Sequence, residues 1–246
     1  MKFSIPKLLL VSSLFFAHSI PTMAGIVMTG TRVIFPAQNT EKTIQLQNKE
    51  NQPYLVQVWL DSGDQNSTPE NTRSPFLANP QIFKINPNQG QIVRIIFTGD
   101  KTQLPQDRES LFFLNFSEIP AIKNQDTDSN KLMVVFKNRL KVLYRPTNLP
   151  DSSSNISKHL SASLKQQANR KVIELKNDSA YYANILSVNI KDTNSSQQSF
   201  SNKTIAPFST MQWEVKPSTS SSSQIQIDLV NDYGATVSFN LPLSNP

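Results

Sequence analysis

A series of short apolar runs constrains this chain more than any other feature, because each run is only a few residues long and ends at Pro, Asn, Asp, Ser or Gly. In Thr43–Gln47 and Tyr54–Leu60, apolar and polar residues alternate as they do in a strand with one buried face. No segment shows a sustained helical period. Short strands with frequent turns favour an immunoglobulin-like β-sandwich.

The runs form two series with different textures. In the first series, strands are predicted at Thr31–Phe35, Thr43–Gln47, Tyr54–Leu60, Ile82–Ile85, Ile92–Thr98, Leu111–Glu118 and 131–145. In the second, they are predicted at Val172–Lys176, Ala183–Ile190, Met211–Val215, Ile225–Val230 and Thr236–Leu241. The polar residues 147–158 suggest a linker, and Ser-rich loops are expected near Asn194–Ser199 and Pro217–Ser223. We therefore predict an all-β chain with domains at 25–146 and 147–246.

The first residues have the layout of a secretory signal peptide. Lys2 and Lys7 make the first seven residues basic, and the apolar run 8–17 follows. Residues 22–24 then lie at the usual distance for a signal-peptidase cleavage site. This run is too short to span a bilayer, and no later segment approaches the ~18 apolar residues of a membrane helix. We expect residues 1–24 to be removed after Ala24, which leaves an exported chain of 246 − 24 = 222 residues without stable membrane insertion.

Composition argues against most enzyme and nucleic-acid-binding classes. The chain has no cysteine, and His159 is the only histidine after residue 24, so neither a Ser-His-Asp triad nor a multi-histidine zinc site can be built. No phosphate-binding or dinucleotide-binding glycine motif is present. The net charge of +6 falls to about +4 without Lys2 and Lys7, and it lacks the basic stripe of a nucleic-acid binder. We predict no catalytic residue, metal site or cofactor; carboxylates such as Asp107 and Glu109 have no second acid at catalytic spacing.

The segment KLMVVFKNRLKVLYRP, residues 131–146, does not fit an ordinary sandwich strand. Leu132, Val134 and Phe136 would point to one face while Met133 and Val135 point to the other, so both faces are apolar. Basic residues follow at once. A local twist or bulge is expected near 137–139, where the apolar alternation passes to the residues from 140 to 144.

Several stretches together resemble the periplasmic chaperones of the chaperone–usher pilus pathway. The matching stretches are TRVIFP (31–36), PYLVQVWL (53–60), INPNQGQIVRI (85–95), LPQDRESLFFLNFSEIP (104–120), LKVLYRP (140–146) and VNDYG (230–234). The second half also has a looser match, KNDSAYYANIL (176–186), in which Ala180 replaces the proline that usually precedes the Tyr pair. The resemblance implies a boomerang of two immunoglobulin-like domains with a cleft between them.

The resemblance also implies a binding site for pilin subunits. In such chaperones an arginine and a lysine in the cleft anchor the C-terminal carboxylate of the subunit, and they match Arg32 and Lys141. A chain-terminal carboxylate accepts charge-assisted hydrogen bonds, and a planar guanidinium with a flexible ammonium suits that task. Bound subunits are then delivered to an outer-membrane usher.

Pilin subunits in this pathway lack their last strand, and the resemblance implies that the chaperone lends one by donor-strand complementation. Leu132, Val134 and Phe136 would enter the open groove of the subunit while Met133 and Val135 cover the core of the chaperone. Full burial of three such side chains contributes on the order of 5–9 kcal/mol. The cations would set the position of the subunit and the apolar side chains its affinity.

Two further features follow from the resemblance. Glu109, Arg145 and Asp232 match a buried ion network that joins the two domains. The loop 121–131 is short and has no flanking cysteines, which favours the short-loop type that assembles pilus organelles rather than thin fibres.

One alternative comes from a different class of protein. A secreted immunoglobulin-like module that binds carbohydrate or a host surface would need an exposed aromatic platform. Phe35, Trp59, Phe97 and Phe116 lie inside strand patterns, so we expect them in the core instead, together with Phe112 or Phe113. An exposed apolar strand would also allow the free protein to self-associate.

Overall fold

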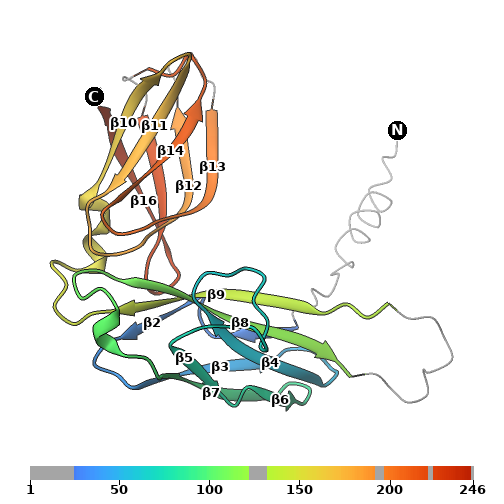
Figure 1. Cartoon of the computed structure of the whole chain (residues 1–246). Helices are drawn as coiled ribbons and strands as arrows, with labels where there is room; N and C mark the ends of the chain where they lie inside the picture. Colours follow the sequence, from blue (N-terminus) through green and yellow to red (C-terminus); the bar gives the residue numbers. More distant parts are fainter. Residues whose placement is uncertain (1–24, 122–131, 192–196, 221–223, 245–246) are drawn as a thin grey trace, which may run out of the picture.

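The computed structural model describes residues 25–121, 132–191, 197–220 and 224–244. Figure 1 shows two β domains that meet at an angle, with the second domain standing on one end of the first. The predicted all-β architecture of two domains is confirmed. Within the described part of the chain, no helix has the length and apolar character needed to cross a membrane.

The first domain consists of two sheets packed face to face. Its four-stranded sheet has the order β1 (Ile26–Met28), β3 (Glu41–Asn48), β7 (Gly90–Phe97) and β5 (Phe76–Asn79). Its five-stranded sheet has the order β2 (Arg32–Pro36), β9 (Phe136–Arg145), β8 (Ser110–Pro120), β4 (Tyr54–Asp61) and β6 (Ile82–Ile85). The pair β2–β9 is parallel, and its neighbours in this sheet pair antiparallel.

Alternation along the strands builds the core between these sheets. Ile44 and Leu46 are buried on β3, as their pattern predicts, whereas Leu55 on β4 is exposed and its neighbours Tyr54 and Val56 are buried. An aromatic cluster fills the end of the sandwich near the second domain. It consists of Phe35, Phe76, Phe97, Phe112 and Tyr144, with ring centroids 5.0–6.4 Å apart.

The second domain is one seven-stranded sheet folded back on itself. Its order is β13 (Gln197–Ile205), β12 (Ala183–Lys191), β15 (Gln224–Val230), β16 (Thr236–Ser244), β10 (Leu160–Gln167), β11 (Arg170–Asn177) and β14 (Ser209–Val215). The parallel pairing of β16 with β10 joins the two halves, and the sheet encloses its own apolar core. A 3₁₀ helix, η3 (Ser153–His159), leads into β10, and a short one, η1 (Lys101–Gln103), precedes β8 in the first domain.

Four strands were not predicted from the sequence. They are β1, β5, β10 and β13. The first two have only three and four residues, while β10 and β13 are largely polar, so none carries a strong alternating signal. The prediction of a loop near Asn194–Ser199 is wrong for residues 197–199, because β13 begins at Gln197. Residues 192–196 and 221–223 lie outside the described residues. Pairing with β12 makes this polar segment a strand, which is a tertiary effect.

Candidate functional site

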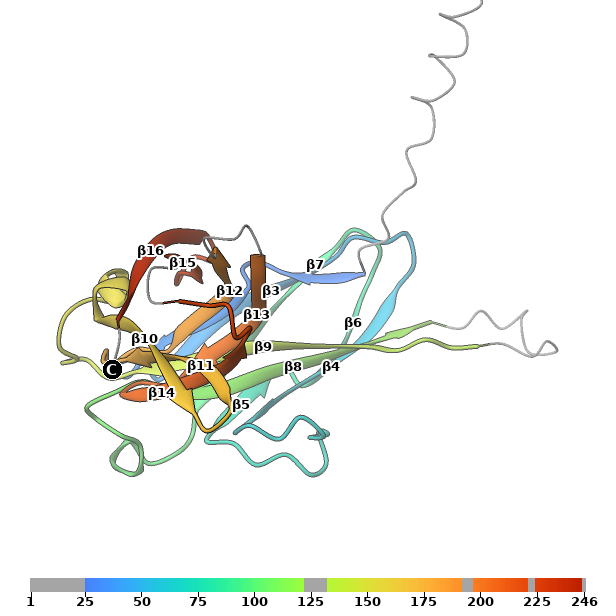
Figure 2. The ribbon, with the colours of Figure 1, turned by 90° about the horizontal axis from the view of Figure 1, so that it is seen from above.

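The apolar segment before β9 lies exposed at the end of the first domain. The side chains of residues 132–136 are all exposed, from 44% for Val135 to 90% for Leu132, and Phe136 is 63% exposed. The segment directly precedes β9 in the connection between β8 and β9, and this hairpin extends beyond the rest of the domain (Figure 2). The expectation that Met133 and Val135 cover the core of their own domain is therefore wrong.

The strand itself is shorter and more regular than predicted. It begins at Phe136 rather than 131, and residues 132–135 have no strand structure; Lys131 lies outside the described residues. The register with β8 runs without interruption from Glu118↔Phe136 to Ser110↔Tyr144. Of the twist or bulge expected near 137–139, the bulge is therefore wrong, and the alternation of the strand places Phe136 on the same side as Tyr144.

One edge of β9 is only partly occupied. The strand β2 pairs with Lys141–Arg145, whereas β8 pairs with the whole stretch 136–144 on the opposite side. Along residues 136–140 the β2-side edge has no backbone partner in the described part of the chain. A strand added to this edge has to stop where β2 begins, and β2 begins at Arg32 opposite Lys141.

Arg32 and Lys141 lie side by side at this point, because they are register partners on neighbouring strands. Together with Thr31, Asn184, Leu186 and Thr236, among others, they line a cavity of about 370 Å³ between the two domains. The structure thus brings the two predicted anchor residues to one cleft.

Both cations are held by groups of the second domain. Lys141 Nζ donates to Asn184 Oδ1 at 2.7 Å and to Thr204 Oγ1, and Arg32 Nη1 donates to the carbonyl oxygen of Val230 at 3.0 Å. Burial, with a smaller contribution from the positive charge of Arg32, lowers the pKa of Lys141 to about 8. Among the described residues, buried Arg32 Nε has no hydrogen-bond partner. Two crowded cations with a spare N–H group favour an anion.

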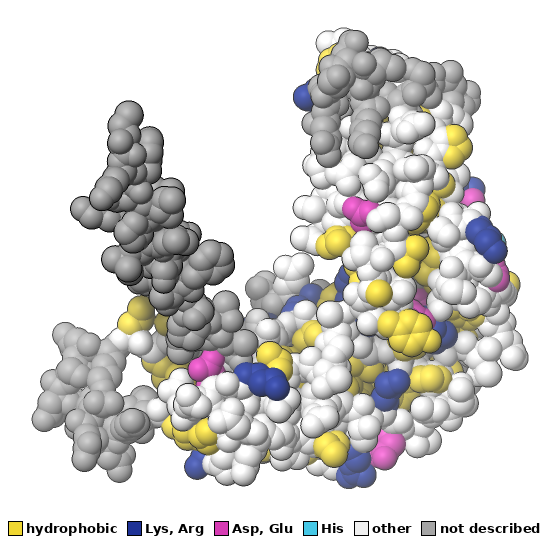
Figure 3. Space-filling model, turned by 180° about the vertical axis from the view of Figure 1, so that it is seen from behind, with side chains coloured by type: hydrophobic (Ala, Val, Ile, Leu, Met, Phe, Trp, Pro, Cys, Tyr) yellow, Lys and Arg dark blue, Asp and Glu magenta, His cyan; other side chains and the backbone are white. Residues whose placement is uncertain are grey.

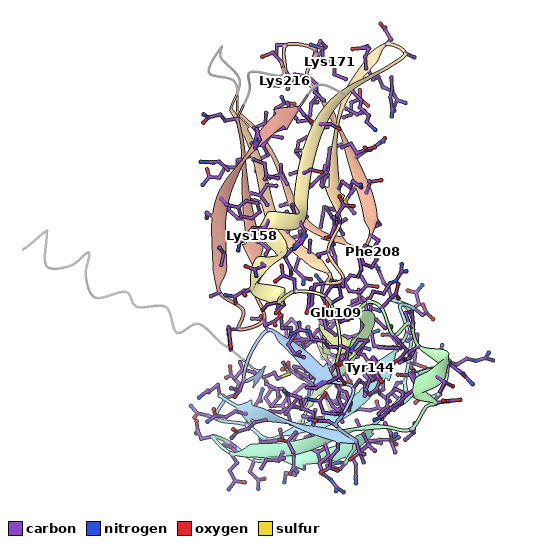
Figure 4. All side chains as sticks on the ribbon, turned by 90° about the vertical axis from the view of Figure 1, so that its left-hand side faces the viewer. Glu109, Tyr144, Lys158, Lys171, Phe208 and Lys216 are labelled. Atoms are coloured by element: carbon purple, nitrogen blue, oxygen red, sulfur yellow. The ribbon has the colours of Figure 1, made fainter. Side chains whose placement is uncertain are left out.

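Arg145 connects the two domains a few residues farther along β9. Its guanidinium contacts Glu109 Oε1 at 2.7 Å on the first domain and Asp232 Oδ2 at 2.7 Å on the second. Glu109 lies at the junction of the domains (Figure 4), where its other oxygen accepts the backbone N–H of Tyr182 at 2.8 Å. The structure therefore brings together the three charges that the sequence singled out.

The environment of these two carboxyl groups differs. Burial raises the pKa of Glu109, with the charge of Arg145 opposing it. At Asp232 burial also acts to raise the pKa, but the hydrogen bonds and charge of Arg145 outweigh burial and hold the pKa below its usual value. The departure at Ala180 does not interrupt this junction, since its carbonyl oxygen accepts the backbone N–H of Glu109 at 2.9 Å.

Two more contacts join the domains and were not predicted. The guanidinium of Arg108 lies 5.0 Å from the ring centre of Phe208, which is near the junction in Figure 4. Gly234 has a positive φ of 83°, and a Cβ on it would lie 2.7 Å from Thr31 Oγ1. Only glycine allows the turn before β16 to pass this close to the start of β2.

Sequence reasoning also missed the residues that hold the middle of β9. Asp61, with only 1% exposure, accepts hydrogen bonds from Arg139 Nη2 at 2.6 Å, Asn115 Nδ2 at 2.7 Å and Ser67 Oγ at 3.1 Å. Burial acts to raise the pKa of Asp61, but the hydrogen bonds from Arg139 and Asn115 outweigh burial and lower the pKa. An acid directly after the apolar run 54–60 was the available signal, but its partner 78 residues away could not be read from spacing.

The remaining charged side chains of the described residues lie outside the cleft between the domains. In the described ranges, no three His, Cys, Asp or Glu side chains gather as they would to hold a metal ion. Figure 3 shows the Lys and Arg side chains of the rear face scattered singly and not gathered into a stripe. His159 lies on the surface and pairs with Asp151 at 2.8 Å.

Family comparison decides the identity of the fold. Residues 25–150 match the family described as "Pili and flagellar-assembly chaperone, PapD N-terminal domain", and residues 155–241 match "Pili assembly chaperone PapD, C-terminal domain". This chain belongs to the PapD family of pilus-assembly chaperones. The resemblance found in the sequence motifs is thereby confirmed, together with two immunoglobulin-like domains.

Similar proteins extend over nearly the whole chain. The probable fimbrial chaperone YehC of Escherichia coli (strain K12) is 35% identical over 230 residues, covering 93% of this chain and 91% of YehC. The chaperone protein HifB of Haemophilus influenzae is 33% identical over 233 residues, covering 93% of this chain and 92% of HifB. The crystal structure of the YadV chaperone aligns with a TM-score of 0.75 at 30% identity, covering 89% of this chain and all of YadV.

Proposed function

We propose that this PapD-family chain is a periplasmic chaperone that binds fimbrial subunits by donor-strand complementation and delivers them to an outer-membrane usher. Fimbrial chaperones such as YehC are its relatives, and the predicted signal peptide would export it. The function is binding without turnover. The short-loop assignment stays a prediction, because most of the loop 121–131 lies outside the described residues.

The exposed segment and its free edge carry this proposal. Five consecutive apolar residues, 132–136, are exposed next to an edge of β9 that β2 leaves unpaired. A strand added there gains backbone hydrogen bonds to β9 and covers Leu132, Val134 and Phe136. Burial of these three side chains contributes on the order of 5–9 kcal/mol. The same exposure favours self-association of the free protein, which stays a prediction.

The cleft decides where the added strand ends. Because β2 occupies the edge from Lys141 onward, the incoming strand stops beside Arg32 and Lys141. A terminal carboxylate is attracted by these two cations, whereas a terminal ammonium is repelled. Fixing the end of the strand fixes its register, and a slip of one residue would turn the donor side chains away from the groove. Arg32 and Lys141 therefore supply register, and residues 132–136 supply affinity.

Charge reversal at the cleft tests this proposal. Lys141→Glu removes one charge-assisted hydrogen bond, worth about 1.5–3 kcal/mol, and places a negative charge beside the carboxylate. Co-expression with a fimbrial subunit, followed by purification of periplasmic complexes, should yield no one-to-one complex. Lys158→Glu, the same change at an exposed lysine on η3, is the matched control and should leave the complex intact.

Undiminished complex formation by Lys141→Glu would refute the anchoring role. Glycan binding by the free chain that is insensitive to changes at Leu132, Val134 and Phe136 would favour a carbohydrate-binding module instead. The structure gives that alternative no platform from the predicted core aromatics, since Phe35, Trp59 and Phe116 are buried.

A further inference from the structure

A buried carboxyl group lies at the end of the first domain opposite the cleft. Glu118, near the end of β8, is only 4% exposed. One of its oxygens accepts the backbone N–H of Ile26 at 2.9 Å, and the other accepts Asn138 Nδ2 at 2.5 Å. The carboxyl group thus connects β1 with β9, and in the register of the sheet it lies opposite Phe136.

The same carboxyl group lies against Gly25. A Cβ on Gly25 would fall 2.2 Å from Glu118 Oε2, so the carboxylate occupies the space in which a side chain would stand. The nitrogen of Gly25 is bonded to the same Cα, so it lies no more than about 5 Å from this oxygen. The carbonyl oxygen of Gly25 accepts the backbone N–H of Lys49 at 3.1 Å, which holds this residue in place.

The charge of Glu118 has no counterpart in the described part of the chain. No Lys or Arg side chain there forms an ion pair with it, and burial, with a further contribution from the negative charge of Glu50, raises its pKa. Two hydrogen bonds from uncharged donors partly offset this cost. A buried carboxylate is unfavourable without a cationic partner, so the site is incomplete electrostatically.

Removal of the predicted signal peptide would supply that partner. Hydrolysis of the Ala24–Gly25 peptide bond by a signal peptidase consumes one water and leaves a carboxylate on Ala24 and an amine on Gly25. With an ordinary α-amino pKa of about 7.7–8.0, this amine takes up a proton at neutral pH. An uncharged amide nitrogen beside Glu118 thereby becomes an ammonium group.

We propose that the α-ammonium group of processed Gly25 forms an ion pair with Glu118 and fixes β1 to the β8–β9 hairpin, next to the exposed residues 132–136. This inference goes beyond the proposed function and rests on cleavage after Ala24. The ion pair exists only in the processed chain, so the end of the domain next to Phe136 gains its last contact after export. Gly25 is suited to the position because any side chain would collide with the carboxylate it has to meet.

Two forms of the exported chain test the ion pair. One begins at Gly25 with a free ammonium group, and the other is the same chain acetylated at Gly25, which restores an uncharged amide nitrogen. Carboxyl NMR titration should show a pKa of Glu118 that is lower by one unit or more in the form with the free ammonium group, because the positive charge weakens proton binding at least tenfold. Thermal unfolding should occur at a higher temperature in the free form.

Substitutions test which carboxyl group is the partner of the α-ammonium group. The difference in unfolding temperature between the two forms should vanish in Glu118→Gln, which keeps the size of the side chain, and should persist in Glu50→Gln. Equal proton affinity of Glu118 in both forms, or loss of the difference in Glu50→Gln instead, would overturn the proposal. So would a mass for the exported protein that shows a first residue other than Gly25. Subunit binding tested with Lys141→Glu is independent of all these outcomes.

Discussion

The two halves of the segment 132–145 have similar composition but opposite environments. From Val142 to Tyr144 the side chains are buried, and those of Val142 and Tyr144 lie in the core between the two sheets. From Leu132 to Phe136 they are exposed, and strand structure begins only at Phe136. The apolar residues of both halves would be predicted from the sequence to lie in a hydrophobic core. The comparison teaches that an apolar pattern predicts a need for burial but does not say which molecule will supply the partner.

The boundary between the halves is set by neighbouring chain segments. The strand β2 covers one edge of β9 from Lys141 onward. The Asp61–Arg139 contact holds the middle of β9 on the face of the sheet opposite to Val142 and Tyr144. Along residues 136–140 the β2-side edge of β9 has no strand partner in the described part of the chain, while β8 still pairs with the opposite edge. This free edge is the place where a second polypeptide can complete the sheet.

Alanine substitutions in the buried and the exposed half should differ strongly in their effect on stability. Tyr144→Ala should lower the free energy of unfolding by about 3–5 kcal/mol, because it leaves a large cavity in the aromatic cluster. Phe136→Ala should change it by no more than about 0.5 kcal/mol, because that ring is exposed. Urea denaturation of the free protein measures both values. Phe136→Ala should instead weaken binding of a fimbrial subunit.

Tyr144→Phe serves as the control for the first substitution. The buried hydroxyl of Tyr144 has no hydrogen-bond partner among the described residues, so its removal should leave stability unchanged or slightly increased. Equal losses of stability in Tyr144→Ala and Phe136→Ala would show that the two halves do not differ as described.

A smaller effect is expected at the centre of the segment. Asp61→Asn keeps the size of the side chain but removes the charge that Arg139 contacts at 2.6 Å. The free energy of unfolding should fall by about 1.5–3 kcal/mol, the range for hydrogen bonds to charged groups. Asp64→Asn, at an exposed acid in the following loop, is the matched control and should cost about 0.5 kcal/mol or less. Equal stability of the two variants in chemical denaturation would show that the charge of Asp61 does not hold β9.

The smallest effect concerns pH and acts at the inner end of the free edge. Since the pKa of Lys141 is about 8 instead of 10.5, the ammonium group loses its proton above pH 8 in the free protein. The dissociation constant of a subunit should then rise toward tenfold per pH unit, about 1.4 kcal/mol. Calorimetric titrations between roughly pH 7 and 9 measure this slope.

Stability should change in the opposite direction over the same range. Between pH 8 and 10.5 the unfolded chain holds a proton on Lys141 that the folded chain has released, so the free energy of unfolding rises with pH. Lys141→Arg keeps its charge at these pH values and should bind with a flat pH dependence. A flat profile for the unsubstituted protein would show that the charge of Lys141 does not hold the carboxylate.

Family motifs and the alternation of apolar and polar residues predicted much of the fold. The family, the two domains and most long strands could be predicted, because alternation in segments such as Tyr54–Leu60 is local. The sequence also singled out Arg32 and Lys141, and Glu109, Arg145 and Asp232, because the family motifs mark them; the structure places each set together, while their roles stay predictions. Strands β10 and β13 could not be predicted, because pairing with neighbours and not their own composition makes them strands.

The amino-acid sequence was enough to establish an all-β chain of the PapD family, because strand alternation and family motifs are local. Export stays a prediction. Three findings came from the packed domains alone: which apolar side chains stay exposed, that no bulge interrupts the register of β9, and that Glu118 lies against Gly25. These facts depend on strand register and on contacts between residues far apart in the chain. Such contacts exist only when the sheets have packed, so no local pattern can contain them.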